Sequence, residues 1–135
     1  MSMDLATISA AQQLMAKTFA RQPVSLPLGR DIFLLETHVA GLRYHQARDA
    51  LPNLRVGTAL SLRREPGNSH DELAIEVFVL ESMKLGYIPR HRNPVLARLM
   101  DAGKQLLASV ASVGADPRYE TDGIPDIRFS IVLRD

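Results

Sequence analysis

The sequence contains no cysteine. This absence excludes thiolate zinc sites, iron–sulfur clusters, cysteine nucleophiles and disulfide-stabilised folds, and it is consistent with a reducing compartment. The chain must therefore be stabilised by an ordinary apolar core. With 135 residues, of which 46% are hydrophobic and 23% charged, it is long enough for one globular domain. A domain of this length buries about two-thirds of its unfolded surface, and a second domain of normal size does not fit.

The sequence also lacks a long hydrophobic run. No stretch approaches the roughly 18–20 apolar residues that cross a membrane. The first ten residues, MSMDLATISA, lack the basic region and the apolar core of a signal peptide. We therefore expect a cytoplasmic protein that has no membrane partner.

Neither sign of charge dominates, since 16 basic residues stand against 15 acidic ones and the formal net charge is +1. A protein that coats nucleic acid by bulk electrostatics would be more basic. The distribution is uneven, however, because residues 43–98 hold nine basic and six acidic residues, and thirteen of the 16 basic residues are arginine. The planar guanidinium group matches phosphate, so this middle region suits a local phosphate-binding groove. Ordinary solvated surface charge is the alternative interpretation.

The N-terminal part of the chain differs from the rest. Residues 4–20 contain neither glycine nor proline, and their apolar side chains recur at helical spacing, which predicts a helix. Residues 22–29 contain two prolines and a glycine and predict a connector. We therefore divide the chain into an N-terminal helix and connector, residues 1–29, and one β domain, residues 30–135.

From residue 30 onward the pattern is that of short strands. The clearest segment is residues 126–134, where every second residue from Ile127 to Leu133 is large and apolar. Residues 65–68, Glu-Pro-Gly-Asn, have the composition of a tight turn between two strands. Six strands are expected, at residues 32–39, 55–63, 73–80, 83–88, 104–113 and 126–134.

One helix is expected among these strands. Asn93 is predicted to be its N-cap, Pro94 its first helical residue, and Gly103 lies just past its end. Six strands with two helices in the whole chain predict a mainly β fold, a small closed or nearly closed β-barrel. The buried stripe of the helix is predicted to consist of Val95, Leu96, Leu99 and Met100.

The sequence has few of the patterns that indicate enzymatic chemistry. It contains no G-x-x-x-x-G-K-[ST] or G-x-G-x-x-G loop and no G-x-S-x-G elbow, and its four histidines show neither H-x-H nor H-E-x-x-H spacing. We therefore expect no cofactor, no metal and no enzymatic activity. A metal-dependent nuclease remains as an alternative, because its acids and lysine could come from Asp71, Glu76, Glu81 and Lys84, although their spacing on strands is poor.

Three short motifs follow one another in the middle of the chain. Residues 39–44 read V-A-G-L-R-Y, residues 63–75 read R-R-E-P-G-N-S-H-D-E-L-A-I, and residues 85–90 read L-G-Y-I-P-R. They resemble the HIRAN family, a small domain found in certain DNA-repair helicase-like remodellers and as a free-standing bacterial protein. That family has a V-x-G-[VL]-[RF]-Y start, an R-[DE]-P-x-N-x-x-D-x-x-A-[IV] turn and a [VL]-G-[YH]-[IL]-[PK]-[RK] return. The resemblance covers roughly residues 33–113.

The resemblance implies a modified oligonucleotide-binding-type barrel that holds the 3′-hydroxyl end of single-stranded DNA. By position in the motifs, Arg43 would contact a phosphate and Tyr44 would stack on a terminal base. Asp71 would accept the hydrogen bond of the 3′-hydroxyl group, and Arg90 would hold a further phosphate. Arg64 is a candidate for a third phosphate contact.

Two residues depart from the pattern of the DNA-binding members of that family. His70 stands where they carry a second stacking tyrosine, and Tyr87 stands where they carry histidine. An imidazole ring can still stack on a base, so the resemblance implies that His70 and Tyr87 also belong to the DNA-binding site.

The same residues have a purely structural interpretation. Asn68 and Asp71 could stabilise the turn through hydrogen bonds from their side chains to the backbone, and Tyr44 and Tyr87 could pack at the rim of the barrel. The function expected from the resemblance is a non-enzymatic module for single-stranded DNA ends in DNA repair or processing, with a helicase or nuclease as partner protein. A protein-interaction adaptor is the alternative from a different class.

Overall fold

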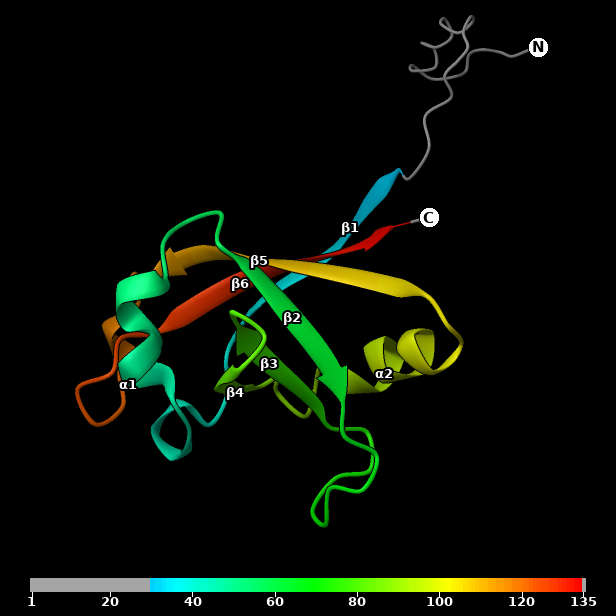
Figure 1. The fold of residues 1–135 in the computed structure, drawn as a ribbon, viewed down its shortest axis with the longest axis horizontal. Helices are drawn as coiled ribbons and strands as arrows, with labels where there is room; N and C mark the ends of the chain where they lie inside the picture. The colour runs from blue at the N-terminus through cyan, green and yellow to red at the C-terminus, as the bar shows by residue number, and fades with distance from the viewer. Residues whose placement is uncertain (1–29, 135) are drawn as a thin grey trace, which may run out of the picture. The chain divides into compact units, whose positions relative to one another are not determined.

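Six antiparallel strands form one sheet within residues 30–134, which are the residues that this computed structural model describes (Figure 1). The strands are β1 (Asp31–His38), β2 (Ala59–Arg64), β3 (Ile75–Val79), β4 (Met83–Tyr87), β5 (Gln105–Val113) and β6 (Ile127–Arg134). The helices are α1 (Ala47–Ala50) and α2 (Asn93–Asp101), together with the short 3-10 helices η1 (Leu42–Tyr44), η2 (Leu51–Asn53) and η3 (Pro117–Tyr119). The prediction of a mainly β fold with six strands is confirmed.

The sheet curls until its two ends almost meet. Its strand order is β1-β6-β5-β2-β3-β4, so β1 and β4 are the edge strands. Just after β1, Ala40 forms an isolated bridge with Tyr87 of β4, and their N–H···O bonds measure 2.8 and 2.9 Å. The sheet is therefore nearly closed, as predicted, by one bridge rather than by a continuous ladder between β1 and β4.

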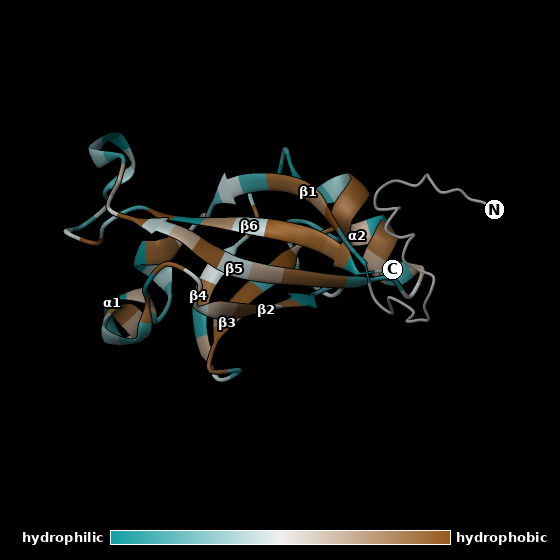
Figure 2. Cartoon of the chain, turned by 90° about the horizontal axis from the view of Figure 1, so that it is seen from above, coloured by the Kyte–Doolittle hydropathy of each residue, from teal (hydrophilic) through white to brown (hydrophobic). Residues whose placement is uncertain are grey.

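The alternation that predicted the last strand reflects a strand with one buried face. Ile127, Phe129 and Ile131 of β6 are fully buried, and the residues between them are partly exposed. Ile75 and Leu85 join them among the largest buried side chains of the core. Figure 2 shows the hydrophobic stretches of β5, β6 and α2. These strands position the loops that line the pockets of the domain.

The second strand begins later than its sequence pattern indicates. Residues 55–58 form a turn, in which the backbone N–H of Arg55 donates to Thr58 Oγ1 at 3.0 Å and Thr58 N–H donates to the carbonyl of Arg55 at 2.9 Å. Gly57 adopts a φ of 92° in this turn. The alternation of residues in the sequence cannot distinguish such a turn from the first residues of a strand, and the prediction of a strand from residue 55 is wrong.

The segment between β1 and β2 contains a short helix that the sequence pattern does not predict. In α1, Ala47 and Ala50 are completely buried, and the N–H of Gln46 donates to the carbonyl of Lys84 at 2.8 Å. A four-residue helix is too short to show a 3.6-residue period. Its position depends on contacts with β4 rather than on local preference.

Helix α2 occupies the predicted place, but two details differ. The N-cap is Arg92, which makes no side-chain cap bond, whereas Asn93 is 2% exposed and directs its amide at Asp71. Leu96 is buried as predicted, whereas Val95 is 68% exposed. The N-cap prediction for Asn93 is wrong because the helix already includes Asn93, whose Nδ2 donates to Asp71 of a distant turn.

The predicted N-terminal helix, residues 4–20, and the connector, residues 22–29, lie outside the described residues. The division of the chain at residue 30 stays a prediction. Among residues 30–134, the structure contains no helix that is long and apolar enough to cross a membrane.

Candidate nucleic-acid interface

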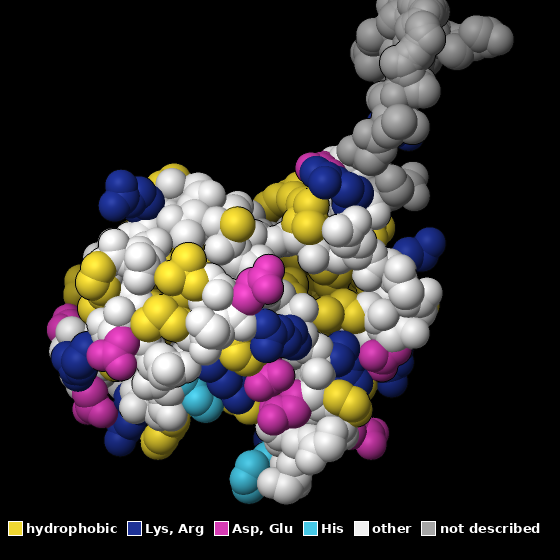
Figure 3. All heavy atoms as spheres, in the orientation of Figure 1, with side chains coloured by type: hydrophobic (Ala, Val, Ile, Leu, Met, Phe, Trp, Pro, Cys, Tyr) yellow, Lys and Arg dark blue, Asp and Glu magenta, His cyan; other side chains and the backbone are white. Residues whose placement is uncertain are grey.

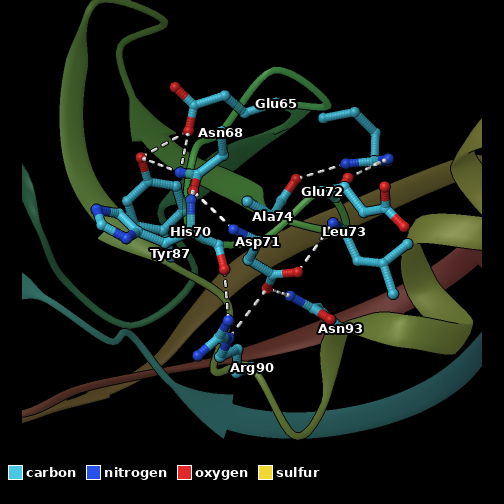
Figure 4. Close-up of polar contacts among 11 residues, drawn as sticks. Glu65, Asn68, His70, Asp71, Glu72, Leu73, Ala74, Tyr87, Arg90 and Asn93 are labelled. Carbon is cyan, nitrogen blue, oxygen red and sulfur yellow. Dashed lines mark hydrogen bonds and ion pairs between the residues drawn. The ribbon is translucent and has the colours of Figure 1, made fainter.

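A pocket of about 300 Å³ opens between the turn at residues 65–74, the end of β4 and the start of α2 (Figure 4). These three segments contain the second and third sequence motifs and the first residues of the helix. The polar and aromatic side chains of the lining come from Asn68, His70, Asp71, Tyr87, Arg90 and Asn93. Four of the six predicted site residues, His70, Asp71, Tyr87 and Arg90, are thus brought together.

The turn that forms one wall is organised by Asn68. Its Oδ1 atom accepts hydrogen bonds from the backbone N–H groups of His70 (2.8 Å) and Asp71 (3.0 Å). Its own N–H donates to the carbonyl of Glu65 at 3.1 Å. Asparagine after Pro-Gly is well suited to this role because its short side chain reaches its own backbone. The structural interpretation of Asn68 is therefore confirmed.

Asp71 presents a charged carboxylate to the pocket. Its Oδ1 accepts from the N–H of Leu73 at 2.9 Å, its Oδ2 accepts from Nδ2 of Asn93 at 2.8 Å, and Arg90 Nε lies 3.7 Å from Oδ2. The hydrogen bond from Asn93, followed by that from Leu73, holds the pKa of Asp71 below its ordinary value. A carboxylate offers about four lone-pair sites, so the oxygens keep capacity for a further donor. Asp71 therefore stabilises the turn and remains an ionised acceptor as well.

Tyr87 is fixed from both sides through its hydroxyl group. The hydroxyl donates to Glu65 Oε1 at 2.7 Å and accepts from Lys84 Nζ at 2.7 Å (Figure 4 shows Tyr87 and Glu65). Lys84 Nζ also lies 3.0 Å from Glu76 Oε2 and 4.2 Å from the centre of the Tyr87 ring. The phenol therefore contributes its ring to the pocket while its polar end is bound internally.

We expect Tyr87 to ionise above the ordinary tyrosine pKa of about 10. Burial raises the pKa of Tyr87, and the hydrogen bond to the Glu65 carboxylate raises it further, because both favour the neutral phenol. Phenolate absorbance can be titrated in wild-type protein and in Tyr87→Phe, and the difference isolates this one of the three tyrosines. A difference curve with its midpoint at or below 10 would contradict the hydrogen-bonded arrangement.

The rim of the pocket is formed by His70 and Arg90, both of which are exposed. Arg90 donates from Nη2 to the backbone carbonyl of His70, and 72% of its side chain is exposed. Its guanidinium group is thus fixed at one end and accessible to a ligand. The neighbouring carboxylate of Asp71 limits its net positive field at this point.

The remaining two predicted residues, Arg43 and Tyr44, line a second pocket of about 350 Å³. Ala40 lies in the lining of both pockets, so the two adjoin at the bridge that closes the sheet. Tyr44 is 73% exposed, and the guanidinium carbon of Arg43 lies 5.2 Å from the centre of its ring. Arg43 Nε also lies 3.4 Å from Oδ2 of the exposed Asp122.

Four residues that line the two pockets lie outside the sequence motifs, namely His38, Tyr119, Thr121 and Asn93. His38 and Tyr119 stack in the second pocket with ring centroids 4.9 Å apart and an interplanar angle of 19°. Asn93 lies in the first pocket. Tyr119 comes from the loop before β6, and an aromatic residue in an otherwise polar loop is the one signal by which the sequence could have indicated it.

Arg64 has a structural role instead of the proposed phosphate contact. Its guanidinium donates to Asp101 at 2.9 Å and to the backbone carbonyls of Ala74 at 2.7 Å and Glu72 at 3.0 Å. Only 13% of its side chain is exposed. The donors of Arg64 are therefore used within the fold, and we count two candidate phosphate contacts, Arg43 and Arg90.

The acidic residues of the nuclease alternative are dispersed. Glu76 pairs with Lys84 across the β3–β4 hairpin, whereas Asp71 lies in the pocket. No group of three or more carboxylates or histidines with metal-binding geometry occurs within residues 30–134.

Comparison with known protein families matches residues 32–122 to the HIRAN domain. The chain belongs to the HIRAN family. The residues that carry the resemblance, from the V-A-G-L-R-Y start to the L-G-Y-I-P-R return, all lie within the matched range. The family is one of binding domains, and membership implies nucleic-acid binding by this HIRAN domain.

Curated relatives contain the domain as a small part of much longer chains. A Fanconi-associated nuclease 1 homolog from Oryza sativa subsp. japonica is 31% identical over 96 residues, which are 68% of this chain and 9% of the relative. A helicase-like transcription factor from Oryctolagus cuniculus is 29% identical over 85 residues, which are 63% of this chain and 8% of the relative. The HIRAN domain described here thus spans less than a tenth of these relatives.

Two solved structures share the fold. A protein from Lactobacillus plantarum superimposes with a TM-score of 0.63 at 34% identity, covering 78% of this chain and 98% of that one. The HIRAN domain of human HLTF superimposes with a TM-score of 0.59 at 20% identity, covering 77% and 78% of the two chains. The second similarity concerns the fold alone.

Proposed function

We propose that this HIRAN domain binds the 3′-hydroxyl end of a single DNA strand and performs no catalysis itself. The observation that carries the proposal is the ionised carboxylate of Asp71, which is held by two hydrogen bonds in the pocket and has Arg90 Nε 3.7 Å away. A fixed acceptor beside an accessible guanidinium matches a sugar hydroxyl followed by a phosphate.

The charge of Asp71 supports selection for a free hydroxyl end. A 3′-hydroxyl group can donate to the carboxylate, whereas a 3′-phosphate would bring at least one negative charge against it. Like charges about 4 Å apart repel by about 1 kcal/mol in water and by several times more near a protein surface. The pocket therefore favours the hydroxyl end through repulsion of the phosphorylated one as well as through a new hydrogen bond.

Stacking supplies the contact with the bases in this proposal. Tyr44 is 73% exposed, lies beside Arg43 and lines the pocket that adjoins that of Asp71. Stacking of a base on an aromatic side chain contributes about 1–3 kcal/mol and accepts any base. His70 at the rim and the ring of Tyr87 supply further aromatic surface, so that the six predicted residues form one binding site.

The relatives support a cellular setting for this proposal. Their names describe a nuclease and a helicase-like transcription factor, and the matched region makes up less than a tenth of each relative. We accordingly propose a helicase or nuclease as the partner protein and DNA repair or processing as the setting. The cytoplasmic location expected from the sequence stays a prediction.

The direct test is a binding titration with two fluorescent single strands that differ only at the 3′ end. The strand with a 3′-hydroxyl group should bind at least about tenfold more tightly than the strand with a 3′-phosphate, since tenfold corresponds to 1.4 kcal/mol. A strand labelled at the 3′ end serves as a control for blocked access. Equal affinity for all three strands would refute end recognition, and no binding to any strand would refute the proposed function as a whole.

The affinity should depend only weakly on salt. Two phosphate contacts, from Arg43 and Arg90, predict a slope of log affinity against log salt of about −1.4 for a single strand. On the face shown in Figure 3, basic and acidic side chains are intermingled, which agrees with a small number of contacts. Affinities measured over a series of KCl concentrations give the slope. A value near −6 would require a broad basic surface and contradict binding in a compact pocket.

A further inference from the structure

Glu65 makes two hydrogen bonds that join the two walls of the Asp71 pocket. It follows β2 directly, and its Oε1 atom accepts from Asn68 Nδ2 at 2.9 Å and from the Tyr87 hydroxyl at 2.7 Å (Figure 4). Asn68 belongs to the turn and Tyr87 to β4. A single carboxylate oxygen thus connects two segments that are far apart in the sequence.

The hydrogen bond from Asn68 links Glu65 indirectly to the backbone of His70 and Asp71. The same Asn68 side chain accepts, at its Oδ1, the backbone N–H groups of His70 and Asp71. The orientation of the amide is therefore determined by acceptor and donors together, because its NH₂ must face Glu65 for its oxygen to face the turn. Loss of the Glu65 acceptor would leave the Asn68 NH₂ group with only its longer hydrogen bond to the Tyr87 hydroxyl, at 3.4 Å. The amide would then hold the backbone that carries Asp71 less firmly.

The bond to Tyr87 belongs to a longer chain of interactions. Beyond the phenol lies Lys84, which is held in turn by Glu76 at 3.0 Å. The hydrogen bonds from Asn68 and Tyr87 hold the pKa of Glu65 below its ordinary value, so its side chain is an anion at neutral pH. Hydrogen bonds to a charged group are about twice as strong as those between neutral groups.

Glu65 itself does not line the pocket. We propose that Glu65 is a positioning residue, which gives the pocket its affinity and its preference for a hydroxyl end by holding Asn68 and Tyr87 in place. The inference rests on the proposed function, because strand binding is its readout. It predicts that a residue without ligand contact controls end discrimination through a side-chain amide and a phenol.

The test compares three variants of the full chain. Glu65→Ala removes the acceptor, whereas Glu65→Gln keeps one acceptor oxygen, loses the charge and carries an NH₂ group in place of the second oxygen. Glu72→Ala is the matched control, because Glu72 is exposed on the same turn and offers only its backbone carbonyl, to Arg64. Glu65→Ala and Glu72→Ala remove the same charge from the same turn, so their difference reports the hydrogen bonds alone. All affinities are measured well below each variant's midpoint of thermal unfolding.

We expect Glu65→Ala to bind the 3′-hydroxyl strand at least about tenfold more weakly than wild type, which corresponds to the loss of one hydrogen bond to a charged group. Its ratio of affinities for hydroxyl and phosphate ends should fall toward one. Glu65→Gln should remain within about threefold of wild type in both measures, and Glu72→Ala should match wild type in the ratio.

Three results would overturn the inference. A Glu65→Ala protein with a lower midpoint of unfolding but unchanged affinity and ratio would show that Glu65 stabilises the fold only. Equal losses in Glu65→Gln and Glu65→Ala would show that charge, and not the hydrogen-bonded geometry, matters. If the wild-type protein binds no strand at all, the proposed function fails and the inference fails with it. If the wild-type protein binds as expected and Glu65→Ala changes neither the affinity nor the ratio, only the inference is refuted.

Discussion

Replacement of Gly86 by alanine is expected to unfold the domain under conditions in which the wild-type protein is folded. A Cβ atom at residue 86 would overlap the backbone carbonyl oxygen of Ala40 and lie 2.9 Å from Cγ1 of Val39. Ala40 forms the bridge that brings the two ends of the sheet together, so its backbone cannot move away without breaking that bridge. We expect a loss of more than about 3 kcal/mol in the free energy of unfolding, beyond the usual cost of overpacking.

Gly67→Ala is the matched control for this prediction. A Cβ atom at Gly67 would meet nothing within 4 Å, and the backbone of Gly67 does not adopt a positive φ. Its effect should therefore lie within about 1 kcal/mol of zero. Urea unfolding followed by circular dichroism measures both variants. Comparable midpoints for Gly86→Ala and Gly67→Ala would contradict the predicted clash of the Cβ atom with the backbone of Ala40.

The largest effect on ligand discrimination is expected from Asp71→Asn. This variant removes the charge that repels a 3′-phosphate, so the ratio of affinities for hydroxyl and phosphate ends should fall from at least about tenfold to about one. The two titrations described for the wild-type protein measure the ratio. Asp101→Asn removes a carboxylate of the same charge that pairs with Arg64 outside the pocket lining, and it should leave the ratio unchanged.

Asp71→Asn should also destabilise the fold. Leu73 N–H donates to one carboxylate oxygen and Asn93 Nδ2 donates to the other, so the new NH₂ group must face a donor on one side. A buried or half-buried donor without an acceptor costs about 1–3 kcal/mol. The affinity ratio must therefore be measured below the lowered unfolding midpoint. An unchanged ratio in the folded variant would assign Asp71 to the turn alone.

The stability of the domain should also depend on pH through the ionisation of Asp71. The folded pKa of Asp71 is depressed, chiefly by the Asn93 hydrogen bond, so its contribution to stability is complete above the unfolded value of about 3.9. That contribution is lost as pH falls through the lower folded pKa. The carboxylate therefore stays ionised, and able to discriminate between strand ends, throughout the neutral and mildly acidic range.

Local patterns in the sequence determined much of the fold. The strict alternation from Ile127 to Leu133 determined β6, because a strand with one buried face needs an apolar side chain at every second position. Pro94 near its start and Gly103 past its end located α2 in the same way. The composition of residues 65–68 located the turn. These features depend on neighbours within a few residues, which is the range that a sequence pattern can report.

The structure brings the six predicted site residues into two adjoining pockets, and their role in binding stays a prediction. Errors arose where a distant partner competed with a local preference. Asparagine is a residue type that favours the N-cap of a helix, but Asn93 donates its side-chain amide to the carboxylate of Asp71. Arginine is a residue type suited to phosphate, but the guanidinium group of Arg64 donates to Asp101 and to two backbone carbonyls.

The sequence by itself thus determined the number and approximate positions of the six strands, the place of helix α2 and the resemblance to the HIRAN family. It also supplied the candidate binding residues. Only the tertiary structure decided which of these residues touch one another: the bridge of Ala40 with Tyr87, the bond of Asn93 to Asp71, and the two bonds that Glu65 accepts. The reason is physical. Periodicity reports which face of an element is buried, whereas a hydrogen bond needs two groups about 3 Å apart, and that distance is set by how the whole sheet curls.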